Sequence, residues 1–124
     1  LTGKATILLV EDEDPVRLFA TRALENKGYT VLSADCAEEA QEIVEEFEGE
    51  IDLAITDVVM PQMDGPTFIA WLVERRPDIQ VIYMSGYAED SFRSNIAGDR
   101  PYDFLPKPFS LQELAVKVKD VMGA

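Results

Sequence analysis

The feature that most constrains the fold is an alternation, repeated five times, of a short apolar run with a longer segment of helical periodicity. The runs have the length of buried strands, and the longer segments place apolar residues three or four positions apart, as amphipathic helices do. The predicted strands are residues 6–10, 29–34, 51–56, 81–84 and 102–105, and the predicted helices are residues 14–27, 36–48, 65–76, 88–97 and 110–122. This alternation predicts an α/β three-layer sandwich with parallel strands and right-handed crossovers. A five-stranded sheet of order 2-1-3-4-5 is one of the two common arrangements.

Local signals set the ends of two helices. Asp14 before Pro15 predicts an N-cap followed by proline in the first helical position. Glu13 and Asp14 are therefore both assigned to capping of the first helix. Ser110 is predicted to cap the last helix, whose core-facing side is predicted to begin at Leu111.

Length and charge narrow the class of protein. The 124 residues are predicted to form one domain, residues 1–124, with a core at residues 6–122. A net charge of −13, from 11 basic and 24 acidic residues, argues against nucleic-acid binding by this domain, because such a surface repels phosphate backbones. No apolar run approaches the roughly 20 residues that a membrane span needs. The single cysteine, Cys36, excludes an internal disulfide and is typical of a reducing compartment, so we expect a cytoplasmic domain without direct membrane contact.

The chain contains no histidine. This composition excludes histidine-based catalysis and histidine metal sites. If the domain handles phosphate through a phosphohistidine, another protein or domain must supply that histidine. The sequence ends soon after the last predicted helix, so the output is expected to be contact with another protein.

Acidic side chains follow two of the predicted strands, at the edge where ligands bind in open α/β sheets. Asp57 follows the third strand directly, and Glu11 and Asp12 follow the first. Because the first and third strands are neighbours in the predicted order, the three carboxylates are expected to lie together. Taken alone, Asp57 is explained equally well as a loop cap, and Glu11 and Asp12 as solvent-facing residues.

Three neighbouring carboxylates repel one another unless a cation neutralises them. Oxygen ligands without histidine or cysteine suit a hard divalent ion, and Mg²⁺ is favoured because it needs few protein ligands. The predicted ligands are Asp12, Asp57 and the backbone carbonyl of Val59, with Glu11 assisting through water.

Two further polar groups end the fourth and fifth strands. Ser85 follows the fourth, and Lys107 follows the fifth between Pro106 and Pro108. A lysine between two prolines is poorly explained as an ordinary surface residue, and a cis Lys107–Pro108 bond could direct its ammonium toward the carboxylates. A carboxylate nucleophile, a divalent cation, a hydroxyl and an ammonium are the groups that phosphoryl transfer to an aspartate requires.

In this order and spacing, the motifs resemble those of the receiver domains of two-component signalling, which have a flavodoxin-like fold. The resemblance covers residues 6–122 and rests on Glu11–Asp12 in ILLVEDE, Asp57 in TDVVMPQMDG, Ser85 in MSGY and Lys107 in FLPKPF. The segments LTGKATILLVEDED, MSGYAED and FLPKPF are most similar to the C-terminal receivers of hybrid histidine kinases of the CckA type.

The resemblance implies that Asp57 accepts a phosphoryl group from the phosphohistidine of a histidine kinase domain, with Lys107 and Ser85 holding phosphoryl oxygens. A histidine phosphotransfer protein is the other implied partner. The domain would catalyse only its own phosphorylation and dephosphorylation, and a hybrid parent chain would be the histidine kinase. The first helix is the expected docking surface, with its apolar contact made by the exposed parts of residues 16–20, and the alternative is that these residues only belong to the core.

The resemblance also implies a conformational switch made by Ser85 and Phe104, although Phe104 stands where many members have tyrosine. The alternative for Phe104 is a static core ring, because phenylalanine suits a strand in any case. Val59 and Tyr87 occupy positions that influence the attacking water in receivers. Because the apolar Val59 side chain cannot orient water, slow self-dephosphorylation is expected.

Three other classes of protein share part of this pattern. A phosphatase of the haloacid-dehalogenase type also uses a strand-end aspartate, but it needs a second aspartate where Val59 stands. A flavodoxin needs a phosphate loop rich in serine, threonine and glycine where this chain has EDED. A degenerate receiver that acts only as an interaction module lacks site residues, whereas all of them are present here.

Overall fold

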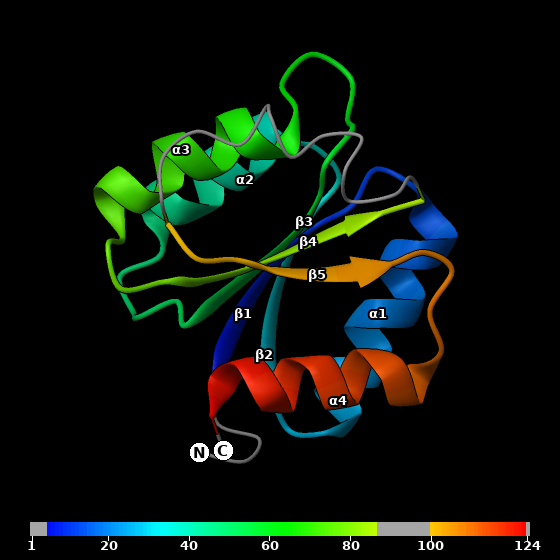
Figure 1. The fold of residues 1–124 in the computed structure, drawn as a ribbon. Coiled ribbons are helices and arrows are strands. Elements are labelled where there is room, and N and C mark those ends of the chain that lie inside the picture. Colours follow the sequence, from blue (N-terminus) through cyan, green and yellow to red (C-terminus); the bar gives the residue numbers. More distant parts are fainter. Residues whose placement is uncertain (1–4, 87–99, 124) are drawn as a thin grey trace.

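A computed structural model describes residues 5–86 and 100–123 of the chain. Its centre is a five-stranded parallel sheet of order β2-β1-β3-β4-β5 (Figure 1). The strands are β1 (Thr6–Val10), β2 (Thr30–Ala34), β3 (Leu53–Asp57), β4 (Gln80–Ser85) and β5 (Asp103–Pro106). The predicted fold class and strand order are confirmed.

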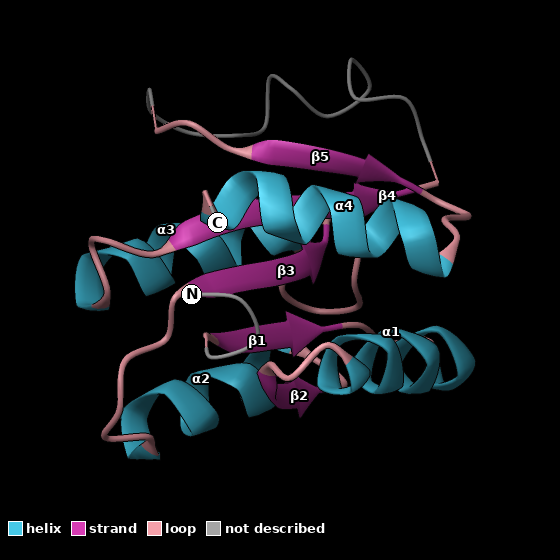
Figure 2. Ribbon diagram, turned by 90° about the horizontal axis from the view of Figure 1, so that it is seen from below, coloured by secondary structure: helices cyan, strands magenta, loops and turns pink. Residues whose placement is uncertain are grey.

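Helices cover both faces of the sheet (Figure 2). They are α1 (Asp14–Asn26), α2 (Ala37–Glu46), α3 (Gly65–Arg75) and α4 (Leu111–Met122). Leu24 of α1 and Leu114 of α4 pack into one buried cluster, while Val44 of α2 and Phe68 of α3 pack into the cluster on the other face. The helix predicted at residues 88–97 lies outside the described residues.

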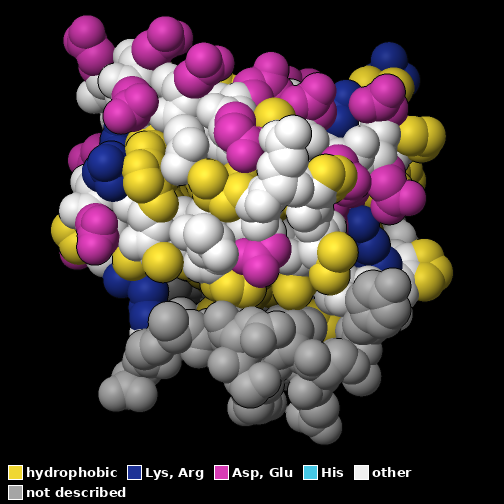
Figure 3. All heavy atoms as spheres, turned by 90° about the horizontal axis from the view of Figure 1, so that it is seen from above, with side chains coloured by type: hydrophobic (Ala, Val, Ile, Leu, Met, Phe, Trp, Pro, Cys, Tyr) yellow, Lys and Arg dark blue, Asp and Glu magenta, His cyan; other side chains and the backbone are white. Residues whose placement is uncertain are grey.

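The negative charge of the chain is unevenly distributed. Acidic side chains gather along one edge of the face formed by α2 and α3, on the side where α2 lies (Figure 3). This edge follows from the sequence of α2, AEEAQEIVEE, whose buried residues Ala37, Ala40 and Val44 leave the glutamates on the other side of the helix.

The central strands place the candidate functional site at the carboxyl edge of the sheet. All five residues of β3 are buried, as expected for a strand covered on both faces. Val10 at the end of β1 pairs with Thr56, so Glu11 and Asp57 emerge side by side at the carboxyl edge. Gly65 at the start of α3 fits closely against this end of β3, because an added Cβ would lie 2.1 Å from the carbonyl oxygen of Asp57.

Two predictions about the helices were wrong. The N-cap of α1 is Glu13 rather than Asp14, and its side chain makes no capping hydrogen bond. The chain enters the helix one residue earlier than predicted, and Asp14 instead pairs with Arg17. Leu111 does not face the core: it is 53% exposed, because it lies at the rim of a cavity between α1 and α4.

Other local predictions were confirmed. Ser110 caps α4 in a reciprocal capping box with Glu113. The Lys107–Pro108 peptide bond is cis. Within the described residues, none of the helices is long and apolar enough to cross a membrane.

Candidate functional site

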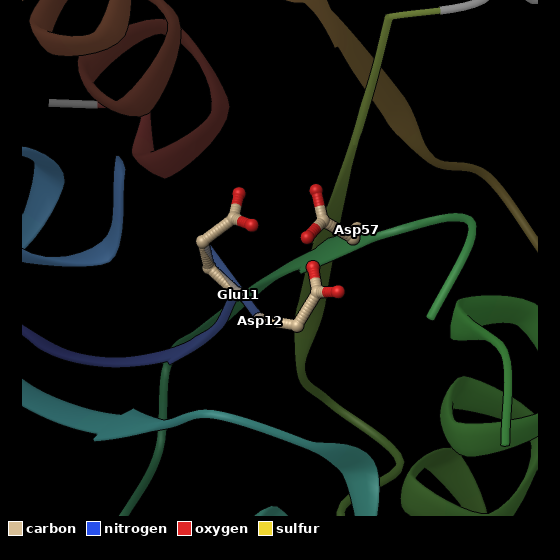
Figure 4. A group of neighbouring side chains, drawn as sticks. All are labelled: Glu11, Asp12 and Asp57. Carbon is tan, nitrogen blue, oxygen red and sulfur yellow. The ribbon is translucent and has the colours of Figure 1, made fainter. Parts of the chain in front are cut away.

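Three carboxylates converge at the carboxyl edge of the sheet, where β1 and β3 end. Glu11, Asp12 and Asp57 each direct a carboxylate oxygen into a common space, with those oxygens within 4.8 Å of one another (Figure 4). Glu11 and Asp57 are buried, whereas Asp12 is exposed. The strand order therefore brings together the acidic residues that the sequence singled out.

Lys107 supplies the positive charge of this site. Its Nζ lies 2.6 Å from Asp57 Oδ1 and 2.7 Å from Glu11 Oε1. The backbone amide of Lys107 donates to the carbonyl of Ser85 (2.8 Å), which fixes the start of the loop after β5 against the end of β4. A side chain that follows β5 thus reaches the carboxylates of Glu11, after β1, and Asp57, at the end of β3.

Glu11 is held from several sides. Its second oxygen, Oε2, accepts the backbone amide of Glu13 (2.9 Å), and its backbone carbonyl accepts Nη1 of Arg17 (2.8 Å). These contacts fix the buried carboxylate and the turn that leads from β1 into α1. Neither contact was predicted, since both depend on how the turn closes.

Glu13 is the functional neighbour that sequence reasoning missed. Its Oε1 lies 3.3 Å from Lys107 Nζ, so a third carboxylate contacts the same ammonium. The position was assigned to helix capping alone. The sequence did contain a signal that Glu13 lies near the site, because it directly follows Glu11 and Asp12 at the same edge of the sheet.

The electrostatics of the site are dominated by excess negative charge. Burial, followed by hydrogen bonding with Glu11, raises the pKa of Asp57 to about 8, and Lys107 only partly opposes this rise. Burial alone would lower the pKa of Lys107, but its contacts with Asp57 and Glu11 outweigh burial and raise it above its usual value. One ammonium is therefore shared by more carboxylates than it can neutralise.

The carboxylate oxygens of the site are the kind of ligand that a hard divalent cation binds. Asp57 Oδ2 is buried and has no hydrogen-bond partner among the described residues, so it is available to a ligand. The exposed carboxylate of Asp12 lies beside it, and every side-chain atom of the cluster that could bind a metal ion is an oxygen. The carbonyl of Val58 already accepts the Gly65 amide (2.8 Å), and Val59, which follows, is an exposed residue (62%). The Val59 carbonyl remains a predicted ligand.

The remaining predicted residues lie at the ends of β4 and β5. Ser85 is buried and is the last residue of β4, one position beyond Met84, which pairs with Asp57. Phe104 on β5 is half-buried and packs against the cluster beneath α3. Tyr87 lies outside the described residues.

Comparison with known proteins identifies the family. Residues 7–119 match the model of the response regulator receiver domain, so the chain belongs to this family. It is a receiver domain of two-component signalling, and its acidic pocket of Glu11, Asp12 and Asp57 fits a phosphoacceptor site.

Two proteins of Brucella abortus (strain 2308) are among its relatives. The chain is 54% identical to the sensor kinase CckA over 122 residues, which cover 98% of this chain but 13% of CckA. It is 33% identical to the response regulator receiver protein CpdR, over 95% of this chain and 97% of CpdR. The chain thus corresponds to a small part of one relative and to nearly all of the other.

A solved structure supports the same grouping. The crystal structure of the receiver domain from the hybrid histidine kinase CckA aligns with a TM-score of 0.75 and 40% sequence identity, covering 95% of this chain and 99% of that one. The predicted resemblance to receivers of the CckA type is confirmed.

Proposed function

We propose that Asp57 is the phosphoacceptor of this receiver and that a partner phosphohistidine is the donor. The observation that carries this assignment is the setting of the Asp57 carboxylate. One oxygen lies 2.6 Å from Lys107 Nζ and the other is buried without a hydrogen-bond partner in the described chain. In the transfer, a carboxylate oxygen of Asp57 forms a bond to phosphorus, the phosphorus–nitrogen bond breaks, and its electron pair stays on the imidazole of the donor.

The proposed site residues divide into a cation side and a phosphate side. Asp12, Asp57 and the Val59 carbonyl would hold Mg²⁺, with Glu11 assisting through water. A bound Mg²⁺ supplies positive charge against the phosphoryl oxygens. Lys107 would hold another phosphoryl oxygen, because its ammonium already lies against Asp57.

Ser85 and Phe104 form the proposed switch. Ser85 ends β4 at the same edge as Asp57, and Phe104 lies two positions before Pro106, which pairs with Ser85. Movement of the Ser85 hydroxyl toward a phosphoryl group would leave room for Phe104 to turn inward. The surface of β5 and α4 would change with it.

A groove beside Lys107 is the proposed docking surface for the donor. It has a volume of about 670 Å³ and is lined by Val16, Phe19, Pro108 and Phe109, with Glu13 and Lys107 at the phosphorylation site. We call it the α1 groove. Phe19 is 39% exposed, and its ring centre lies 6.5 Å from that of Phe109. An exposed aromatic ring, Phe19, beside the half-buried ring of Phe109 and next to the acceptor suits a protein partner rather than a small donor.

The proposed partners are a histidine kinase domain and a histidine phosphotransfer protein, and the proposed location is the cytoplasm. A parent hybrid kinase is supported by the CckA relative, whereas CpdR corresponds to this domain over nearly its whole length. The domain itself would modify only Asp57.

Incubation with acetyl phosphate and Mg²⁺, followed by intact mass measurement, tests the assignment. The wild type should gain the mass of one phosphoryl group, and Asp57→Asn should not. Asp78→Asn is the matched control, because Asp78 is exposed and precedes β4, at the edge of the sheet opposite the site. An unmodified wild type, or a modification that survives in Asp57→Asn, would overturn the proposal.

A further inference from the structure

Glu13 stands between the phosphorylation site and the α1 groove. Its backbone amide donates to Glu11 Oε2 (2.9 Å), and its Oε1 lies 3.3 Å from Lys107 Nζ. Its side chain is 62% exposed and forms part of the groove wall. Glu13 therefore contacts the site from its solvent side.

Neither helix capping nor a stabilising ion pair accounts for the Glu13 carboxylate. The side chain of Glu13 makes no capping hydrogen bond, so it does not satisfy a backbone amide of the first turn of α1. Its contact with Lys107 is longer than those of Glu11 and Asp57, and an exposed ion pair contributes little to stability. Glu11 and Asp57 already provide more negative charge than Lys107 can neutralise.

The effect of the third carboxylate is electrostatic. It adds a negative charge on the side from which a donor in the α1 groove would approach, close to the Lys107 ammonium that would hold an oxygen of the transferred phosphoryl group. Arg17 on α1 does not offset it, since its guanidinium is engaged by Asp14 and by the Glu11 carbonyl. A negative charge at this place repels an anionic donor and slows its encounter with the site. Because Glu13 is exposed, salt screens this repulsion.

We propose that Glu13 is a specificity-determining residue that slows phosphorylation by small anionic donors. The inference rests on the proposed function of Asp57. With acetyl phosphate, an oxygen of Asp57 bonds to phosphorus, the phosphorus–oxygen bond to the acetyl group breaks, and acetate leaves with the electron pair. Before that step the dianionic donor must pass Glu13. A protein donor that covers the α1 groove and sets a lysine or arginine against Glu13 is not subject to this repulsion.

Rates of Asp57 phosphorylation by acetyl phosphate and by the less negatively charged phosphoramidate test the inference, with Mg²⁺ saturating for each variant. Glu13→Gln should raise the second-order rate with acetyl phosphate about two- to tenfold at low salt, with a smaller rise for phosphoramidate. The rise should shrink toward the wild-type rate at about 0.5 M salt. Glu74→Gln is the matched control, because it removes one exposed charge near the end of α3, far from the carboxyl edge of the sheet.

Glu13→Asp separates charge from contact with Lys107. Aspartate keeps the negative charge but is one methylene shorter, so it loses the contact. If charge decides the rate, Glu13→Asp should behave as the wild type. Equal acceleration by Glu13→Asp and Glu13→Gln, or a rise that salt does not reduce, would overturn the inference.

A second measurement distinguishes failure of this inference from failure of the proposed function. Binding of inorganic phosphate, followed by NMR shifts of the Gly86 and Lys107 amides, does not require a covalent step. Glu13→Gln should bind phosphate several-fold more tightly than the wild type and Glu74→Gln at low salt. If Asp57 is never phosphorylated, the proposed function fails. If Glu13→Gln binds phosphate no more tightly than the wild type, the role of Glu13 fails, whether or not Asp57 is phosphorylated.

Discussion

The carboxylate of Asp57 at the end of β3 lies 2.6 Å from the ammonium of Lys107, which follows β5. The two groups are drawn together although both are largely buried, and Glu11 shares the same ammonium at 2.7 Å. One positive charge among several carboxylates leaves the site under-neutralised. This imbalance favours a divalent cation, and it makes the protonation of Asp57 sensitive to its surroundings.

Replacing Lys107 by alanine should lower the rate of Asp57 phosphorylation by acetyl phosphate about 100-fold or more, the usual effect of losing one preorganised group that stabilises transition-state charge. Lys107→Arg should recover only part of the rate, because a planar guanidinium cannot occupy the position of a compact ammonium. The rate is measured by mass spectrometry at fixed Mg²⁺.

Lys117→Ala on α4 is the control for loss of a positive charge away from the site. A Lys107→Ala variant that reacts as fast as Lys117→Ala would show that the ammonium has no part in the transfer.

Asp57→Asn should stabilise the cation-free protein, and the gain should depend on pH. In the unfolded chain the pKa of Asp57 is near 4, whereas burial raises it to about 8 in the folded protein. The folded state therefore holds an extra proton between these values, so this residue's contribution to stability is full below pH 4 and is lost as the pH rises to about 8. Urea unfolding at pH 5 and pH 8 without Mg²⁺ measures the effect.

The relevant quantity is the difference in unfolding free energy between Asp57→Asn and the wild type, because the other carboxylates contribute to both proteins. This difference should be larger at pH 8 than at pH 5. A difference that stays constant with pH would contradict the raised pKa of Asp57.

Mg²⁺ should raise the thermal unfolding temperature of the wild type, because a ligand that binds only the folded state stabilises it by mass action. Asp12→Asn and Asp57→Asn should each weaken Mg²⁺ affinity about tenfold or more, since each removes a charged oxygen from the cluster. Asp78→Asn should respond to Mg²⁺ as the wild type does. Equal responses in all four proteins would exclude the acidic cluster as the cation site.

The arrangement of the main site residues could be predicted because it follows from topology. Once β1 and β3 are neighbours, Glu11 and Asp12 must lie beside Asp57, and the alternation of strands and helices leaves this strand order as one of two common arrangements. The placement of Lys107 was indicated by the prolines on either side of it. These predictions needed only the order of elements and the ends of strands.

The contacts that were missed depend on how loops close in three dimensions. Glu13 reaches Lys107 because the turn after β1 and the loop after β5 meet at the sheet edge. The position of Glu13 directly after Glu11 and Asp12 indicates its nearness to the site, but not its contact with Lys107. Leu111 has the helical spacing of a core residue, yet it lies where α4 begins and borders an open cavity. Periodicity identifies the face of a helix, but it does not show whether a neighbouring element covers that face.

Arg76 provides a test of a stabilising contact away from the site. Its guanidinium donates to the carbonyls of Phe47 (2.7 Å), Gly49 (2.7 Å) and Val44 (3.2 Å), which closes the C-terminal end of α2. Arg76→Ala should lower the free energy of unfolding by roughly 1–3 kcal/mol, because several carbonyls lose a charged donor.

Arg75→Ala is the matched control for Arg76→Ala, since Arg75 is exposed and stacks over Trp71 at 4.1 Å from the ring centre. It should cost less than Arg76→Ala in urea unfolding. Arg76→Lys should recover little, because one ammonium cannot reach all three carbonyls. Equal losses for Arg75→Ala and Arg76→Ala would argue against the role of Arg76 at the end of α2.

Gly65→Ala should damage both the fold and the phosphorylation site. A Cβ at this position would lie 2.1 Å from the carbonyl oxygen of Asp57 and 3.1 Å from Val58 Cα, and both contacts are with backbone. Since neither atom belongs to a flexible side chain, the end of β3 must shift, and the position of Asp57 relative to Lys107 would change with it. We expect a loss of roughly 2 kcal/mol or more in unfolding free energy, of the size that overpacking causes.

Gly86→Ala distinguishes this close contact from a general intolerance of alanine at the site edge, because a Cβ at Gly86 meets no atom of residues 5–86 or 100–123 within 4 Å. It should leave the unfolding free energy near that of the wild type. In Gly65→Ala, phosphorylation by acetyl phosphate should fall even under conditions where the variant is fully folded, since a displacement of about 1 Å at a reacting group can cost about 100-fold in rate. A folded Gly65→Ala protein that is phosphorylated at the wild-type rate would show that the contact between Gly65 and Asp57 does not position the acceptor.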